Sequence, residues 1–468
     1  MTAIVTSKFR VLNAENFKED ISSAGTEVFV GIGKTDAWSL TTSDTTDTTP
    51  FVPYDTLDSI TEARENLFGM KRLAASDISH VVPRHTWTTN STYVAWDTGI
   101  PPSTGPDIFD KAFYIITKDF KVYKCIIAGT TGSTQEPVQT LTDPQPESDG
   151  YVWKYMFTVS VADAEKFLTT SYMPVKTVSL AYADDAAAET ALSEGDYAQY
   201  LNQKASRDSV TAAGIEKIHV TNGGTGYSQA PVVHITGSGT GATATAAVSG
   251  GSVTSITVTA KGTNYSVSDI VISGGGGSAA DATARAVLSP QYGHGVDPVK
   301  DLGAFFIAIN TLLTGNEGAD LTVGNDFRQI TLVKNPFNFG TTTVSTSTTL
   351  NATPALKFTT APTFVVDELI TQGSNPDSPQ AYVTFINAGT GDVYFNQNSK
   401  TGYGPFVESV AVVGATSAAS HVTKTAAAGF LLNEEVDKHS GDIIFLENRN
   451  PINRTVTQIE DIKIIIEF

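Results

Sequence analysis

The end of the chain, residues 440–468, constrains the fold more than any other stretch, because it contains two β-type runs. Residues 442–447 are largely apolar, and residues 461–468 place isoleucine at every second position. Alternation of this kind is typical of a strand with a buried face. We therefore expect the chain to finish inside a sheet. The expected neighbours of its last strand come much earlier, at residues 112–128, 151–159 and 329–333.

The connection between the two runs is polar and contains Pro451 and several asparagines, which favour turns. We expect a loop here. We also expect residues 448–454 of this loop to face a partner subunit, with the strand that follows closing the body of the protein.

Composition excludes several classes of protein. The sequence has 49 acidic and 30 basic residues, a formal net charge of −19 and no run of Lys or Arg, which argues against a nucleic-acid-binding surface. No apolar run approaches the roughly 18 residues that a membrane span needs. Abundant Thr, Gly, Ser and Val indicate a β-rich chain with many turns. We expect a soluble protein that is made in the cytosol.

An internal repeat occupies residues 215–288. Each copy has an alternating strand, a Gly-Thr-x-Tyr turn at 224–227 or 262–265, a second strand and a small-residue strand. This pattern predicts two consecutive β-meanders, which pair and bury a common face. Residues 340–430 are rich in Thr and Ser and predict a second β-rich insertion.

Local signals predict a few helices. Asn13 is a candidate N-cap for a helix that follows a short opening strand. Ser59 and Glu62 form a capping-box pattern for a helix at 59–67, and Ser160 is a candidate cap with Asp163 at the third helical position.

Candidate chemical sites are weak. Residues 31–35 (GIGKT) resemble the end of a phosphate loop, but Val28 stands where that motif needs glycine, so a strand-ending turn is the better interpretation. His80 and His85 lack a nearby third ligand for a metal. Cys125, the single cysteine, lies among apolar neighbours, which predicts a buried, inert thiol. We predict no catalytic, cofactor-binding or metal-binding residue.

Seven stretches, in order, resemble the small wedge subunit of the baseplate in contractile-tailed phages of the T4 type. They are residues 3–10, 80–87, 122–125, 149–159, 325–336, 439–454 and 458–468. The resemblance implies a mainly β homodimer that lies in each of six wedges around the tail hub and contacts other wedge proteins. It carries over no catalytic residue and no cofactor. Both β-rich insertions depart from the compact family pattern.

These observations together predict an antiparallel, β-sandwich-like body with a few short helices and two inserted β-rich domains. The body comprises residues 1–205, 291–339 and 431–468, and the insertions comprise 206–290 and 340–430. We expect a structural wedge protein of the virion tail. The alternatives are a receptor- or glycan-binding tail protein, with the inserted modules making the contact, and an enzyme such as a glycan hydrolase. We also expect that deletion of residues 215–288 leaves dimerisation and assembly intact.

Overall fold

The computed structural model describes residues 4–23, 25–38, 50–98, 108–209, 213–276, 281–290, 292–317, 320–375 and 377–468. It is mostly β, with several antiparallel sheets and few helices, as predicted. The chain divides into two compact units. Unit 1 contains residues 1–15, 79–308 and 465–468, and unit 2 contains residues 16–78 and 309–464.

The α-helices of the described residues are short, apart from the first and the fifth. They are α1 (Ser7–Ser22), α2 (Leu57–Asn66), α3 (Val161–Phe167), α4 (Asp185–Ala191), α5 (Glu194–Ser209) and α6 (Pro298–Leu302). Single 3₁₀ turns are η1 (Ala75–Asp77), η3 (Ile108–Asp110) and η5 (Ala426–Ala428). No helix in these ranges is both long and apolar enough to cross a membrane.

Two of the three expected helix starts are wrong. Helix α1 begins at Ser7, so Asn13 lies inside it and the opening strand is absent from the described residues. Helix α2 is capped by Thr56, whose hydroxyl accepts a hydrogen bond from the Ser59 amide at 3.2 Å. In both cases the helix begins further upstream than predicted, at or directly after another polar residue. The prediction for α3 is confirmed, because the Ser160 hydroxyl accepts a bond from the Asp163 amide.

The central sheet of unit 2 has the order β18-β2-β1-β16-β27 and is antiparallel. Its strands are β18 (Thr349–Asn351), β2 (Leu67–Arg72), β1 (Val28–Gly33), β16 (Asp326–Lys334) and β27 (Asp442–Asn453). Residues 329–333 of β16 pair with β27, where Thr331 lies opposite Leu446. The expected loop after residue 447 is wrong as far as Asn453. Pro451 is tolerated there because β27 lies at an edge of the sheet.

The second large sheet of unit 2 has the order β24-β23-β20-β21-β22-β19-β25. Its strands are β19 (Ala355–Leu356), β20 (Leu369–Gln372), β21 (Gln380–Ile386), β22 (Val393–Asn396), β23 (Ala411–Gly414), β24 (Ser420–Val422) and β25 (Leu431–Leu432). A buried cluster that includes Phe358, Phe364, Ile370, Val383 and Phe395 packs this sheet. A small ladder joins β17 (Phe337–Asn338) to β26 (Val436–Asp437).

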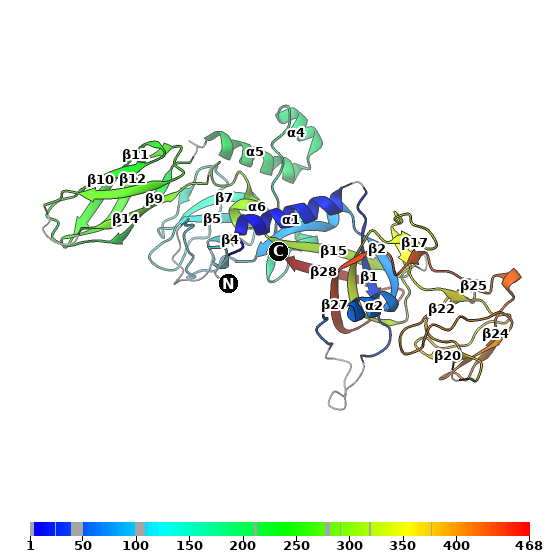
Figure 1. Ribbon diagram of the computed structural model, residues 1–468. Coiled ribbons are helices and arrows are strands. Elements are labelled where there is room, and N and C mark those ends of the chain that lie inside the picture. Colours follow the sequence, from blue (N-terminus) through cyan, green and yellow to red (C-terminus); the bar gives the residue numbers. More distant parts are fainter. Residues whose placement is uncertain are drawn as a thin grey trace. The chain divides into compact units, whose positions relative to one another are not determined.

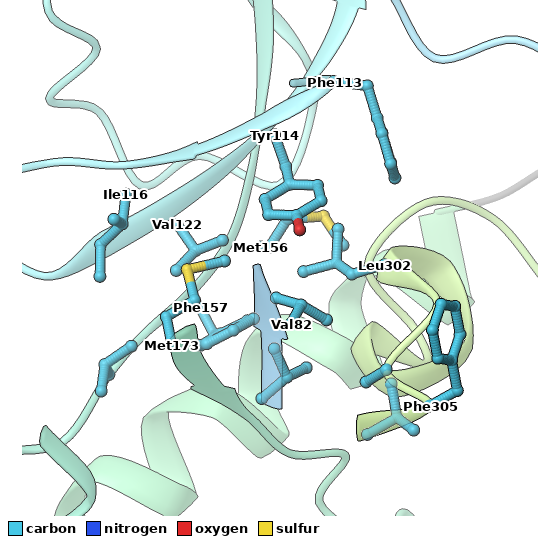
Figure 2. Close-up of a cluster of buried hydrophobic side chains, with 14 of the residues drawn as sticks. Val82, Phe113, Tyr114, Ile116, Val122, Met156, Phe157, Met173, Leu302 and Phe305 are labelled. Carbon is cyan, nitrogen blue, oxygen red and sulfur yellow. The ribbon is translucent and has the colours of Figure 1, made fainter. Parts of the chain in front are cut away.

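Unit 1 is built around an antiparallel sheet of order β4-β5-β7-β6. These strands are β4 (Tyr114–Ile116), β5 (Lys121–Ile127), β6 (Gln145–Pro146) and β7 (Val152–Thr158). One face carries the buried aromatics Tyr93, Tyr123, Tyr151 and Trp153. Figure 2 shows the other face, where side chains from β4, β5 and β7 meet Val82, Met173, Leu302 and Phe305.

The last strand, β28 (Ile459–Glu467), belongs to a different sheet, of order β28-β15-β3-β8. Its companions are β15 (Phe306–Thr314), β3 (Ile78–Pro83) and β8 (Tyr172–Val175). The expectation that β28 lies with residues 112–128, 151–159 and 329–333 is therefore wrong. A period-two pattern shows which face of a strand is buried, but it does not show which strand lies beside it.

The repeat folds as a β module within unit 1 (Figure 1). Its sheets are β11-β12-β9-β14 and β10-β13, formed by β9 (Ile215–Asn222), β10 (Val232–Gly237), β11 (Thr240–Ser249), β12 (Ser252–Thr263), β13 (Ser268–Ser273) and β14 (Thr283–Leu288). The copies pair with each other, β10 with β13, as predicted. The two repeat tyrosines, Tyr227 and Tyr265, both lie in the shared core.

Candidate assembly surface

The glycines of the GIGKT stretch serve packing. A Cβ on Gly31 would lie 2.5 Å from the Thr331 hydroxyl and 2.6 Å from a Leu67 methyl, so only glycine fits between the neighbouring strands. The Lys34 side chain is buried, with Nζ 3.4 Å from Asp36 and 3.5 Å from Glu62. Because this cation is already paired with carboxylates, the geometry favours the strand-ending turn over a phosphate loop.

The other residues singled out from the sequence are structural. His80 Nδ1 lies 3.0 Å from the Ala304 carbonyl, and burial lowers the pKa of His85, which packs against the Tyr114 ring. Burial also raises the pKa of the Cys125 thiol to about 12, so the reactive thiolate is suppressed at neutral pH. Across the described ranges, no group of three or more His, Cys, Asp or Glu is arranged to hold a metal.

Arg454 ends the segment that was expected to face a partner, and it is completely buried. Its Nε donates to Glu460 at 3.0 Å, and its two terminal nitrogens donate to the Thr322 and Gly315 carbonyls at 2.8 and 2.7 Å. The guanidinium therefore joins β28 to the chain between β15 and β16. For Arg454 the partner-facing interpretation is wrong, and no motif in the sequence marks this contact.

Helix α1 presents an apolar stripe that sequence reasoning missed. Its N-terminal approach and outer face expose Ile4 (82%), Val5 (63%), Phe9 (54%) and Leu12 (49%). Phe9 and Leu12 are three residues apart and share one face of the helix, a pattern that the misplaced helix start concealed, and Ile4 and Val5 lie just before its first residue. We call these four residues the α1 stripe.

The opposite side of α1 is fixed to unit 1. Val11 and Ala14 are buried. The Arg10 guanidinium lies 3.5 Å from the Phe305 ring centroid, and it pairs with Glu467 and the Phe468 carbonyl. Glu467 and Phe468 thus help to hold the helix in place, so the α1 stripe is presented on an anchored element.

A second exposed apolar set lies in unit 2. Phe51, Val52, Tyr54 and Leu57 are each at least half exposed, and we call them the 51–57 segment. It borders a pocket of about 260 Å³ whose walls include Trp38, Lys400 and Asn448. The Asn448 amide donates to the Phe51 carbonyl at 2.9 Å, and the Trp38 indole donates to the Arg449 carbonyl at 3.0 Å. Part of the predicted partner-facing stretch therefore supports this surface.

The comparison with protein families matches the two ends of the chain. The model described as Bacteriophage T4, Gp8 matches residues 3–100 and 383–468. Both exposed apolar sets, as well as β27 and β28, fall within these residues, whereas the repeat module falls outside them. No curated protein matches the chain.

Proposed function

We propose that the protein is a structural component of a phage tail baseplate, and that it is the dimeric wedge subunit, because residues 3–100 and 383–468 match the T4 Gp8 family model. In this role it joins neighbouring wedge proteins in the machinery of host attachment and tail contraction. It acts through protein contacts, without catalysis, and enters the baseplate during assembly in the host cytoplasm. The family match at both ends of the chain carries this proposal.

We assign the dimer contact to the α1 stripe. A two-fold interface brings the same surface of both protomers together, so the α1 stripe of one protomer would pack against the α1 stripe of the other. The antiparallel arrangement also suits the charges. It brings the exposed Lys8 of one protomer toward Glu15 of its partner, whose carboxylate lies 3.4 Å from Lys300 of its own chain and retains 30% side-chain exposure. Contiguous exposed apolar residues of this kind mark interaction sites on soluble proteins.

The 51–57 segment is assigned to a contact with another wedge protein. Its apolar side chains border a pocket lined by both apolar and polar residues, which matches the mixed composition of interfaces between subunits that fold separately. It lies in the family-matched part of the chain, so the contact belongs to the wedge body.

Size-exclusion chromatography with light scattering tests the dimer. We expect a dimer for the wild type and a monomer for Phe9→Ser/Leu12→Ser. Each of these half-exposed side chains contributes about 1 kcal/mol on burial, which is half of the roughly 2 kcal/mol for complete burial. Four side chains per dimer give about 4 kcal/mol, and the dissociation constant rises about a thousandfold.

The matched control is Val138→Ser/Leu141→Ser, which removes two similarly exposed apolar side chains outside the family match. This control should remain dimeric. A wild-type chain that is monomeric and ignores every other wedge protein would refute the proposed function. A dimer that survives the Phe9→Ser/Leu12→Ser change would refute only the assignment to the α1 stripe.

A receptor- or glycan-binding role for the inserted modules is the second candidate. It is favoured by hydroxyl pairs on the repeat module, such as Thr243 with Thr259 and Thr221 with Thr283, each 2.7 Å apart and exposed. Binding of the purified chain to host-surface polysaccharide, lost on deletion of the module, would support this role. Absence of such binding by the assembled tail would exclude it.

A further inference from the structure

A polar pocket of about 120 Å³ lies in unit 1 where the repeat module meets the rest of the unit. A single water needs about 10–15 Å³ of such volume, so the space is larger than one water requires. Lys154 and His294 line it from outside the module, and Glu216 of β9 and Lys261 of β12 line it from the module.

The Lys154 ammonium is a buried cation without a close counter-ion. The residue is 2% exposed. Its Nζ donates to the Ser206 hydroxyl at 2.9 Å and to the Thr142 carbonyl, and no carboxylate in the described part of the chain lies within ion-pair distance. Burial lowers the pKa of Lys154 to about 8, against the opposing effect of Asp143 and Asp301. A buried charge in this state is costly unless an anion approaches it.

The His294 ring lines the same pocket. It is 7% exposed, and neither ring nitrogen has a hydrogen-bond partner, although Nε2 lies 3.6 Å from Glu216. Burial and the charge of Lys124 lower the pKa of His294, so the ring is neutral at pH 7 and can donate through one nitrogen. The Lys154 ammonium and the His294 ring thus line one small space, with both ring nitrogens buried and Nε2 on the side of Glu216.

Glu216 limits the negative charge that a ligand of this pocket can carry. Its carboxylate is occupied by Lys261 at 2.9 Å and by the Ser289 hydroxyl at 2.6 Å. Asp143 adds a second negative charge to the lining. These carboxylates repel a dianion more strongly than a monoanion.

We propose that this pocket binds a monovalent carboxylate, which pairs with the Lys154 ammonium. The ligand is a small free carboxylate or the carboxylate of an acidic side chain from another baseplate protein. Because the walls come from both the repeat module and its support, bound carboxylate would stabilise the junction between them.

The direct test measures the pKa of Lys154 by NMR of ¹³Cε-labelled lysine in the wild-type full chain. Titrations in acetate and in chloride at equal ionic strength are compared, and the Lys154 signal is assigned by its absence from the spectrum of Lys154→Met. If acetate binds the charged lysine tenfold more tightly than the neutral amine, saturating acetate raises the pKa by about one unit. The same pKa in acetate and chloride would overturn the proposal, as would an equal rise with sulfate.

A second test compares the thermal unfolding of the wild type with that of matched lysine variants. Acetate should raise the melting temperature of the wild type and of Lys118→Met, which removes an exposed lysine, but not that of Lys154→Met. N-acetylglutamic acid α-amide, whose single carboxylate is that of the side chain, distinguishes a side-chain ligand from a small free carboxylate. A larger effect than that of acetate identifies a side-chain carboxylate, and an equal or smaller one identifies a free carboxylate. Stabilisation of Lys154→Met equal to that of the wild type would contradict the site.

Discussion

Replacing Arg454 by methionine tests the contact that fastens the C-terminal strand in unit 2. Methionine preserves much of the apolar stem but removes the guanidinium, so Glu460 keeps its charge in a site where its side chain is only 6% exposed. Breaking a buried ion pair from one side typically costs 3–5 kcal/mol. We therefore expect the free energy of unfolding of unit 2 to fall by about 4 kcal/mol.

The assay is urea unfolding followed by hydrogen exchange in peptides from β16 and β27, which reports unit 2 separately from unit 1. With a dependence on urea of about 2 kcal/mol per molar, the midpoint falls by about 2 M. The double variant Arg454→Met/Glu460→Leu removes both charges and should recover at least half of the loss. A loss below about 1 kcal/mol for Arg454→Met would refute the reasoning, because that is the value of a solvent-exposed pair.

Three further predictions concern packing, reactivity and the inserted module. Gly31→Ala overpacks the central sheet of unit 2 and lowers its free energy of unfolding by about 1–3 kcal/mol, measured by urea denaturation; an unchanged midpoint would contradict the close packing. Cys125 resists thiol reagents at pH 8 in the folded chain and reacts in denaturant, measured by absorbance; rapid labelling without denaturant would contradict its burial. Deletion of residues 215–288 leaves a dimer in light scattering but lowers stability, since it removes the ion pair between Arg285 and Asp97, and Asp97→Asn recovers part of the loss. A monomeric deletion variant would contradict this expectation.

Local patterns predicted what depends on neighbouring residues. The repeat module could be predicted because each copy carries the same strand and turn signals, and its pairing buries a face that neither copy could bury alone. The cap at Ser160 could be predicted for the same reason, since its partner Asp163 lies three residues away. These features need no knowledge of the rest of the fold.

Contacts between distant residues could not be predicted in this way. Arg454 lies in a stretch rich in asparagine, a composition that predicts a solvent-exposed loop. Its partners at Thr322 and Gly315 come from a much earlier part of the chain. The neighbours of β28 were wrong because alternation does not identify a strand's partner. The α1 stripe was missed because an incorrect helix start at Asn13 placed Phe9 outside the helix.

An electron cryomicroscopy map of the intact tail baseplate tests the central claim most directly. We expect two copies of the chain in each of the six wedges, related by a two-fold axis, with their α1 stripes in contact and the 51–57 segments against other wedge proteins. Density for this chain outside the wedges, or as single copies whose α1 stripes face solvent, would contradict it.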